Sequence, residues 1–154
     1  MPSSNSAAAV DTSHVTIYRV GRDQTNLIRT INEAVFNSTH VINRFDHTDL
    51  LMLVAEIDGT PAGFKVGYQL REGTFYSAKG GVVDAARRRG VARALLRQML
   101  DIVQSWGYDR FVYDTFPNKH PGMTVLGLNE GFEVIKAGYS PQYEDYRLRF
   151  EYRF

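Results

Sequence analysis

The 154-residue chain contains no cysteine, and this absence excludes several kinds of chemistry. Without thiols the protein forms neither disulfides nor thiolate metal sites, and no catalytic step can pass through a thioester on the chain itself. The four histidines, at positions 14, 40, 47 and 120, lack a spacing that would place metal ligands together on one element. The sequence therefore predicts no metal site and leaves any chemistry to other side chains.

A long apolar run and a strong net charge are missing as well. No stretch is long enough to span a bilayer, and residues 1–9 lack the basic start and apolar centre of a signal peptide. With 18 basic and 17 acidic residues the net charge is +1, so no overall field attracts nucleic acid or an anionic membrane. We therefore expect a cytoplasmic protein without a nucleic-acid or membrane partner, in which any basic function is local.

The length suits one domain, since a chain of this size buries roughly two thirds of its unfolded surface. Residues 1–13 are predicted to form a flexible tail and residues 14–154 a single domain. No internal repeat is visible, and the apolar content of 44% is ordinary for a soluble globular protein.

Hydrophobic periodicity divides this domain into strands and helices. Strands are expected at residues 15–20, 51–57, 62–70, 74–83, 110–114, 132–139 and 148–154. Helices are expected at about residues 25–36, 91–106 and 123–130, and residues 37–49 form a looser segment with room for a further helix. The pattern predicts an α/β, or layered α+β, fold: a mixed, mostly antiparallel sheet of six to seven strands flanked by about four helices.

A basic turn that contains glycine precedes the most strongly amphipathic segment. The turn, Arg87-Arg88-Arg89-Gly90-Val91-Ala92, follows an apolar run that ends at Val82-Val83 and opens the helix predicted from Val91 to Trp106. The N–H groups at a helix N-terminus have no intrahelical partner and carry partial positive charge, so a diphosphate can bind there. Gly90 keeps side-chain bulk away, and the arginines can add charge-assisted hydrogen bonds. This turn therefore predicts a phosphate-binding site.

The arrangement resembles the acyl-coenzyme A site of the GNAT superfamily, the Gcn5-related N-acetyltransferases. The family pattern, Gln/Arg-x-x-Gly-x-Gly/Ala, is met by Arg87, Gly90 and Ala92, and Gly131-Phe132 resembles a recurrent Gly-Phe after the family's fourth helix. The order of elements between residues 15 and 154 is also similar. The resemblance implies a GNAT-like fold and an N-acetyltransferase that passes an acetyl group from acetyl-coenzyme A to a small-molecule or peptide amine by direct attack in a ternary complex.

The resemblance also implies which residues hold the co-substrate. Main-chain groups of Val82 would pair with the pantetheine arm, and Gly80 and Gly81 would leave room for it. The strands before and after the motif helix, residues 74–83 and 110–114, would splay apart around the thioester. The implied binding residues are Val82, Val83, Arg87, Arg88, Arg89, Gly90, Val91, Ala92, Arg93 and Asn118.

The arginine cluster has plainer interpretations, namely a solvated helix face or a nucleic-acid contact. Five arginines lie within eleven residues: Arg87, Arg88, Arg89, Arg93 and Arg97. A solvated helix start requires neither the Gly-x-Ala sequence at residues 90–92 nor the glycine pair in the preceding strand. A slot for phosphate and pantetheine benefits from both, which favours coenzyme A binding.

Three side chains are candidates for proton transfer or acceptor binding. Tyr76 lies six residues before Val82, where several family members carry Glu or His, and strand parity places it on the same face as Gly80 and Val82; the alternative is a half-buried strand tyrosine. His120 lies in a loop beside the predicted cleft, and the alternative is a surface histidine. Asp114 ends a strand, where it can accept a proton, bind a cationic acceptor or cap the following turn.

Departures from the family pattern keep other functions open. Many members carry a tyrosine four residues before the Gly-Phe glycine, where it protonates the departing thiolate, but this chain has Gly127 there. The link between Asn118 and its helix is also longer than usual. The alternatives are a module that binds acyl-coenzyme A without turnover and a nucleic-acid adaptor that uses the arginines.

Loops are expected to choose the acceptor, since specificity usually lies in the connections between elements. These loops are residues 37–49 and 115–122, and the segment Arg44–His47 falls where the family builds its acceptor wall. The family resemblance also allows a homodimer that forms through the aromatic last strand.

Overall fold

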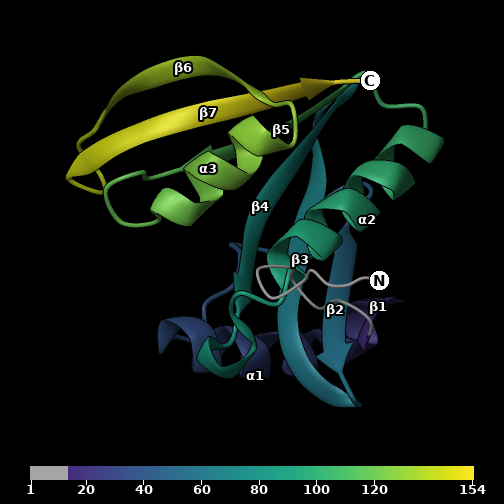
Figure 1. The fold of residues 1–154 in the computed structure, drawn as a ribbon. Coiled ribbons are helices and arrows are strands. Elements are labelled where there is room, and N and C mark those ends of the chain that lie inside the picture. Colours follow the sequence, from purple (N-terminus) through teal and green to yellow (C-terminus); the bar gives the residue numbers. More distant parts are fainter. Residues whose placement is uncertain (1–13) are drawn as a thin grey trace, which may run out of the picture.

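A seven-stranded sheet in the order β1-β2-β3-β4-β5-β7-β6 forms the centre of the protein (Figure 1). The computed structural model describes residues 14–154, so the tail predicted for residues 1–13 lies outside the described residues. Neighbouring strands are antiparallel except for β4 and β5, which are parallel. The strands are β1 (Val15–Val20), β2 (Leu51–Ile57), β3 (Thr60–Arg71), β4 (Thr74–Val82), β5 (Arg110–Thr115), β6 (Glu133–Ser140) and β7 (Asp145–Arg153).

Helices cover parts of both faces of this sheet. The described residues contain three α-helices rather than about four, namely α1 (Thr25–Phe36), α2 (Val91–Ser105) and α3 (Pro121–Asn129), together with two short 3₁₀ turns. Residues 37–49 form a loop without a helix. The Asn32 side-chain amide donates to the carbonyls of Ser38 and His40, which holds this loop against α1. The layered α/β class and the mostly antiparallel sheet are confirmed.

The core has two layers because successive side chains of a strand point to opposite faces. Met52 and Val54 of β2 pack with Ile28 and Ile31 of α1 on one face. Leu51 and Leu53 point to the other face, where the apolar stripe of α2 covers them. That stripe is buried as its periodicity predicts: Val91, Leu95, Leu96, Met99 and Val103 are each at most 2% exposed.

The strands β4 and β5 diverge after a short parallel pairing. Their register runs from Thr74 opposite Arg110 to Ser77 opposite Tyr113 and then stops, although β4 continues to Val82. Because β7 pairs with the whole of β5, the β5-β7-β6 part of the sheet leans away from β4 and carries α3 with it (Figure 1). The expected splay of these two strands is therefore present.

A β-bulge in β4 overturns the expected strand parity. Val66 of β3 is opposite Lys79, whereas the next residue, Gly67, is opposite Ser77, so Ala78 is an extra residue in the ladder. An extra residue reverses the alternation of faces beyond it. Tyr76 therefore faces the α1 side of the sheet, whereas Gly80 and Val82 face the α2 side.

Candidate active site

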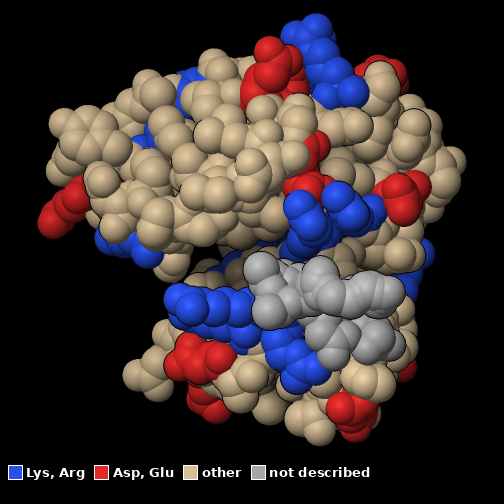
Figure 2. Space-filling view, in the orientation of Figure 1, with Lys and Arg blue, Asp and Glu red and all other residues tan. Residues whose placement is uncertain are grey.

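A hollow lies where the two strands separate. Figure 2 shows the molecule indented between the part that carries α3 and the part that carries α1, with Lys and Arg side chains along the indentation. We call the space between the diverging ends of β4 and β5 the cleft. Its α2 side and its α1 side differ in chemistry.

The helix α2 begins at the cleft without a side-chain cap. Its N-cap is Gly90, with φ of 76°, a conformation that L side chains rarely adopt. The first helical N–H that donates is that of Ala94, to the Gly90 carbonyl at 3.0 Å. The N–H groups of Val91, Ala92 and Arg93 precede this bond and are available for an anion.

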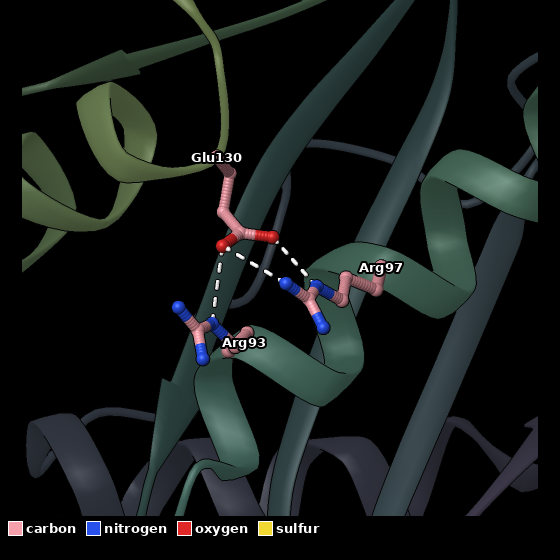
Figure 3. A network of polar contacts seen from close by, with 3 residues as sticks. All are labelled: Arg93, Arg97 and Glu130. Carbon is pink, nitrogen blue, oxygen red and sulfur yellow. Dashed lines mark hydrogen bonds and ion pairs between the residues drawn. The ribbon is translucent and has the colours of Figure 1, made fainter.

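Two arginines of the predicted phosphate site are engaged by carboxylates. Arg87 Nε lies 3.3 Å from Asp84 Oδ1. Arg93 Nε lies 3.1 Å from Glu130 Oε2, and Arg97 Nε lies 2.7 Å from Glu130 Oε1 (Figure 3). The Glu130 side chain is only 7% exposed, so this network ties α2 to the end of α3.

Arg88 and Arg89 remain as cations at the start of α2. Neither forms an ion pair with a side chain of residues 14–154, and Arg88 is exposed. Arg88 has φ of 65° and Gly90 has φ of 76°, so the turn has left-handed backbone at two positions separated by Arg89. These two side chains can add charge beside the open helix start.

The open edge of β4 faces the cleft with main-chain groups. Val83 N donates to the Ala62 carbonyl of β3 at 2.9 Å, and N–H groups of successive strand residues point to opposite edges. The N–H of Val82 therefore points away from β3, toward the cleft. An extended ligand can pair with this edge as a further strand would.

The glycine pair in β4 serves packing rather than leaving an empty slot. A Cβ on Gly81 would lie 2.8 Å from Cγ1 of Val35, so this glycine allows α1 to approach the sheet. A Cβ on Gly80 would lie 3.1 Å from the Phe64 carbonyl oxygen of β3. The expectation that both glycines make room for a ligand is wrong for Gly81, because α1 takes that room.

On the α1 side, Tyr76 and Asp114 come together with a residue that the sequence did not point to. The Tyr76 hydroxyl lies 3.4 Å from Asp114 Oδ2. Arg149 of β7, directly opposite Asp114 in the ladder, donates to Oδ1 from Nε at 2.8 Å and to Oδ2 from Nη2 at 3.0 Å. Burial and the neighbouring Asp114 charge raise the pKa of Tyr76 to about 12.

Aromatic rings extend this cluster along the α1 side. Tyr68 of β3 meets the Tyr76 ring edge-on, with centroids 5.7 Å apart. His47, from the loop of residues 37–49, stacks on Tyr68 at 3.6 Å. Burial and the Arg44 charge lower the pKa of His47, so its imidazole is neutral at neutral pH. The segment Arg44–His47 thus contributes a ring to the cluster.

The other two predicted side chains have different neighbours. His120 is the N-cap residue of α3, and its ring meets the Phe36 ring of α1 edge-on at 6.5 Å. Asn118 Nδ2 donates to Asp145 Oδ1 at 3.1 Å, at the start of β7. The structure therefore brings Tyr76 and Asp114 together, places His120 against the end of α1, and engages Asn118 at the β6–β7 turn.

Sequence reasoning missed Arg149 and Lys65. Arg149 belongs to the alternating polar face of the last strand, and its place opposite Asp114 follows only from the pairing of β5 with β7. Lys65 interrupts the apolar run of β3 and is 5% exposed, and burial lowers its pKa to about 8. A charged residue inside a continuous apolar strand was the available signal.

Two negative findings apply to the described part of the chain. Among residues 14–154, no three His, Asp or Glu side chains form a group that could hold a metal ion. None of the helices in this range has both the length and the apolar character needed to cross a membrane.

Comparisons with known proteins agree with this geometry. A family model described as "Acetyltransferase (GNAT) family" matches residues 22–123. A search of curated proteins finds no match. Solved structures are similar in fold at low identity. An IAA acetyltransferase from Bacillus cereus superposes with a TM-score of 0.76 at 16% identity, over 91% of this chain and 99% of that one.

Two further structures have the same fold. The ribosomal-protein-S18-alanine N-acetyltransferase from Escherichia coli gives a TM-score of 0.77 at 14% identity, over 90% of this chain and 93% of that one. A GNAT family acetyltransferase from Elizabethkingia anophelis, solved with acetyl-CoA bound, gives 0.73 at 16% identity, over 92% of this chain and 99% of that one.

Proposed function

Because the chain belongs to the GNAT acetyltransferase family, we propose that it transfers an acetyl group from acetyl-coenzyme A to an amine by direct attack in a ternary complex. The observation that carries this proposal is the uncapped start of α2 beside the open edge of β4. The similar structure from Elizabethkingia anophelis contains acetyl-CoA, which supports the choice of co-substrate.

The α2 side of the cleft would bind the co-substrate. The N–H groups of residues 91–93 would hold the diphosphate, with Arg88 and Arg89 adding charge, because donors at a helix start favour anions. The outward N–H of Val82 would donate to the pantetheine arm or to the oxygen that becomes negative during attack. Arg93 can contribute its main-chain N–H while its side chain stays with Glu130.

The α1 side would receive the acceptor. Acetyl-coenzyme A supplies the activated acyl group, and the amine attacks only when its lone pair is free of a proton. Tyr76 is protonated at neutral pH, since its pKa is raised to about 12, so it acts as a hydrogen-bond donor and not as a base. Both Asp114 oxygens already accept hydrogen bonds. The chain therefore accelerates transfer chiefly by positioning the two reactants, while water carries the proton.

A second function, binding of acyl-coenzyme A without turnover, is favoured by one observation. Position 127 is glycine, and the nearest phenol, that of Tyr113, is buried and donates to the Met123 carbonyl at 2.8 Å. No tyrosine is thus available there to protonate a departing thiolate. A thiol such as that of cysteine has a pKa of roughly 8.5, so a thiolate is a tolerable leaving group even without an acid, and we favour catalysis.

Calorimetric titration with acetyl-coenzyme A tests the binding site. We expect stoichiometric binding by the wild type and at least about a tenfold loss for Gly90→Val, because a side chain would strain the left-handed N-cap and crowd its N–H groups. Gly107→Val is the matched control: Gly107 follows the same helix with φ of 87° and has open space around it. Equal affinity of Gly90→Val and wild type, or no binding by the wild type, would contradict the proposal.

Turnover can be measured through release of the coenzyme A thiol. The chain has no cysteine, so a thiol reagent reports coenzyme A alone. Amine-dependent release across a panel of amines supports the acetyltransferase. Tight binding with no release for any amine would leave the binding module as the function.

A further inference from the structure

The acceptor side of the cleft contains one arginine with hydrogen-bonding capacity to spare. Arg149 donates to Asp114 through Nε and Nη2, and within residues 14–154 its Nη1 has no hydrogen-bond partner. A guanidinium carries five N–H donors in a planar fork. The Arg149 side chain is 28% exposed, whereas that of Asp114 is 11% exposed, so Arg149 is the more accessible member of this pair.

Asp114 and Tyr76 fix the direction of this fork. The Asp114 carboxylate accepts hydrogen bonds from one edge of the guanidinium, from Nε at 2.8 Å and from Nη2 at 3.0 Å. The guanidinium carbon lies 5.8 Å from the centre of the Tyr76 ring. The Tyr76 hydroxyl in turn points at Asp114. A side chain held along one edge by an ion pair and placed beside an aromatic ring loses little rotamer freedom when it binds a ligand, so this arginine is pre-organised.

The carboxylates near Arg149 on this face are already paired. Asp114 forms an ion pair with Arg149. Glu151 lies two residues further along β7, and its Oε1 is 2.9 Å from Arg153 Nε while its Oε2 is 3.5 Å from Arg110 Nη1. Lys79 adds a further positive charge on the α1 side, where its ammonium donates to the His40 carbonyl. Among residues 14–154, the carboxylates beside Arg149 on this face are all paired, so a cationic acceptor would meet positive charge there, whereas an anionic group would find free N–H donors.

We propose that Arg149 binds a carboxylate of the acceptor, and that the acceptor is a small amine bearing a carboxylate, of the free amino acid class. The inference rests on the proposed function, because it names the substrate of the same cleft. Arg149 lies opposite Asp114 at the end of the β5 ladder, where the cleft opens. A carboxylate held there leaves an amine a few bonds away free to enter between β4 and β5. A planar guanidinium binds a carboxylate through two parallel N–H···O bonds, which also orients the amine.

The test compares matched acceptors that differ only at the carboxylate. Glycine, alanine, glutamate and phenylalanine are each offered with acetyl-coenzyme A as the free acid and as the α-carboxamide, and thiol release gives kcat/KM. We expect the free acid to be preferred at least about tenfold, as for a charge-assisted hydrogen bond to a half-buried group. The preference should appear mainly in KM. Equal rates for acids and amides, or a preference for amides, would overturn the proposal.

Variants of Arg149 show whether this residue causes the preference. Arg149→Gln should abolish the difference between acid and amide by raising KM for the acid, and Arg149→Lys should restore part of it. Arg153→Gln is the control, because it lies on the same strand and face but pairs with Glu151. If Arg149→Gln unfolds by leaving Asp114 unpaired, the double variant Asp114→Asn/Arg149→Gln removes both charges. A preference that survives in these variants would overturn the assignment.

The proposed function and this inference fail in distinguishable ways. If acetyl-coenzyme A does not bind, both fail. If it binds and only peptide N-termini or amines without a carboxylate are acetylated, the transferase stands and the carboxylate site is wrong. If acetyl-coenzyme A binds and none of the eight acceptors reacts, the assignment of the acceptor to the free amino acid class is wrong, whereas the coenzyme A site stands.

Discussion

The hydroxyl of Tyr113 occupies the space into which a side chain at position 127 would extend. A Cβ on Gly127 would overlap that oxygen and would lie 2.9 Å from Cδ2 of Phe150. Tyr113 is 2% exposed, and burial raises the pKa of its phenol, which stays protonated and bound to the Met123 carbonyl. The glycine that replaces the family's tyrosine is therefore a packing requirement of α3 against β5.

We expect Gly127→Ala to lower the free energy of unfolding by about 1–3 kcal/mol, as overpacking of a filled core does. Urea denaturation measures this loss. Gly122→Ala is the matched control in the same helix, because a Cβ there meets nothing within 4 Å. This control should change stability by less than about 0.5 kcal/mol. Equal stability of the two variants would show that α3 adjusts freely over Tyr113.

Tyr76→Phe should lower kcat/KM by less than about tenfold and leave the shape of the pH–rate profile unchanged between pH 6 and 9. The reason is that the pKa of Tyr76 is raised to about 12, so its phenol does not titrate in this range and only donates a hydrogen bond. Steady-state rates at several pH values measure both quantities, with the exposed Tyr146→Phe as the control. Loss of the acidic limb in Tyr76→Phe would identify the phenol as a base instead.

The sequence predicted the elements well because their signals are local. The stripe from Val91 to Val103 repeats at helical spacing and is buried as expected, and Asp58-Gly59 does join β2 to β3. Helix α3 begins at Pro121, two residues before the predicted start, since proline suits the first helical turn.

The acceptor side was less predictable because it depends on contacts distant in sequence. The bulge at Ala78 reverses the parity of β4, and no residue type there announces it. The pairing of Asp114 with Arg149 requires β7 to insert between β5 and β6, which the chain order does not reveal. Arg93 has a carboxylate partner 37 residues away, at Glu130.

Lys65→Met should stabilise the protein at neutral pH by about 3 kcal/mol at most. The pKa of Lys65 falls from 10.5 to about 8 on burial, so the charged amine costs stability below pH 8 and the cost disappears as pH rises toward 10.5. Denaturation at pH 7, 8 and 9.5 should therefore show wild-type stability rising with pH and that of the variant staying flat by comparison.

Lys79→Met is the control, because this substitution should change the folding stability in the opposite direction. The Lys79 ammonium donates to the His40 carbonyl at 2.7 Å and lies 4.7 Å from the centre of the Phe36 ring, so its removal should destabilise the protein by about 1 kcal/mol. If Lys65→Met also destabilises, the Lys65 ammonium has a favourable partner, and its burial is not the dominant effect.

Glu130→Gln should destabilise the protein by on the order of 1 kcal/mol at pH 7, because the side chain joins α2 to the end of α3 through Arg93 and Arg97. The hydrogen bond from Arg97 lowers the pKa of Glu130, so its contribution is present above about pH 4.3 and is lost as pH falls through the lowered value. Urea denaturation at pH 7 and pH 3 measures the penalty of Glu130→Gln, which should be smaller at the lower pH. Arg97→Gln should reproduce most of the loss, since Arg97 makes the shortest contact at 2.7 Å. A Glu130→Gln penalty that persists undiminished at pH 3 would mean that the carboxylate acts through packing rather than through charge.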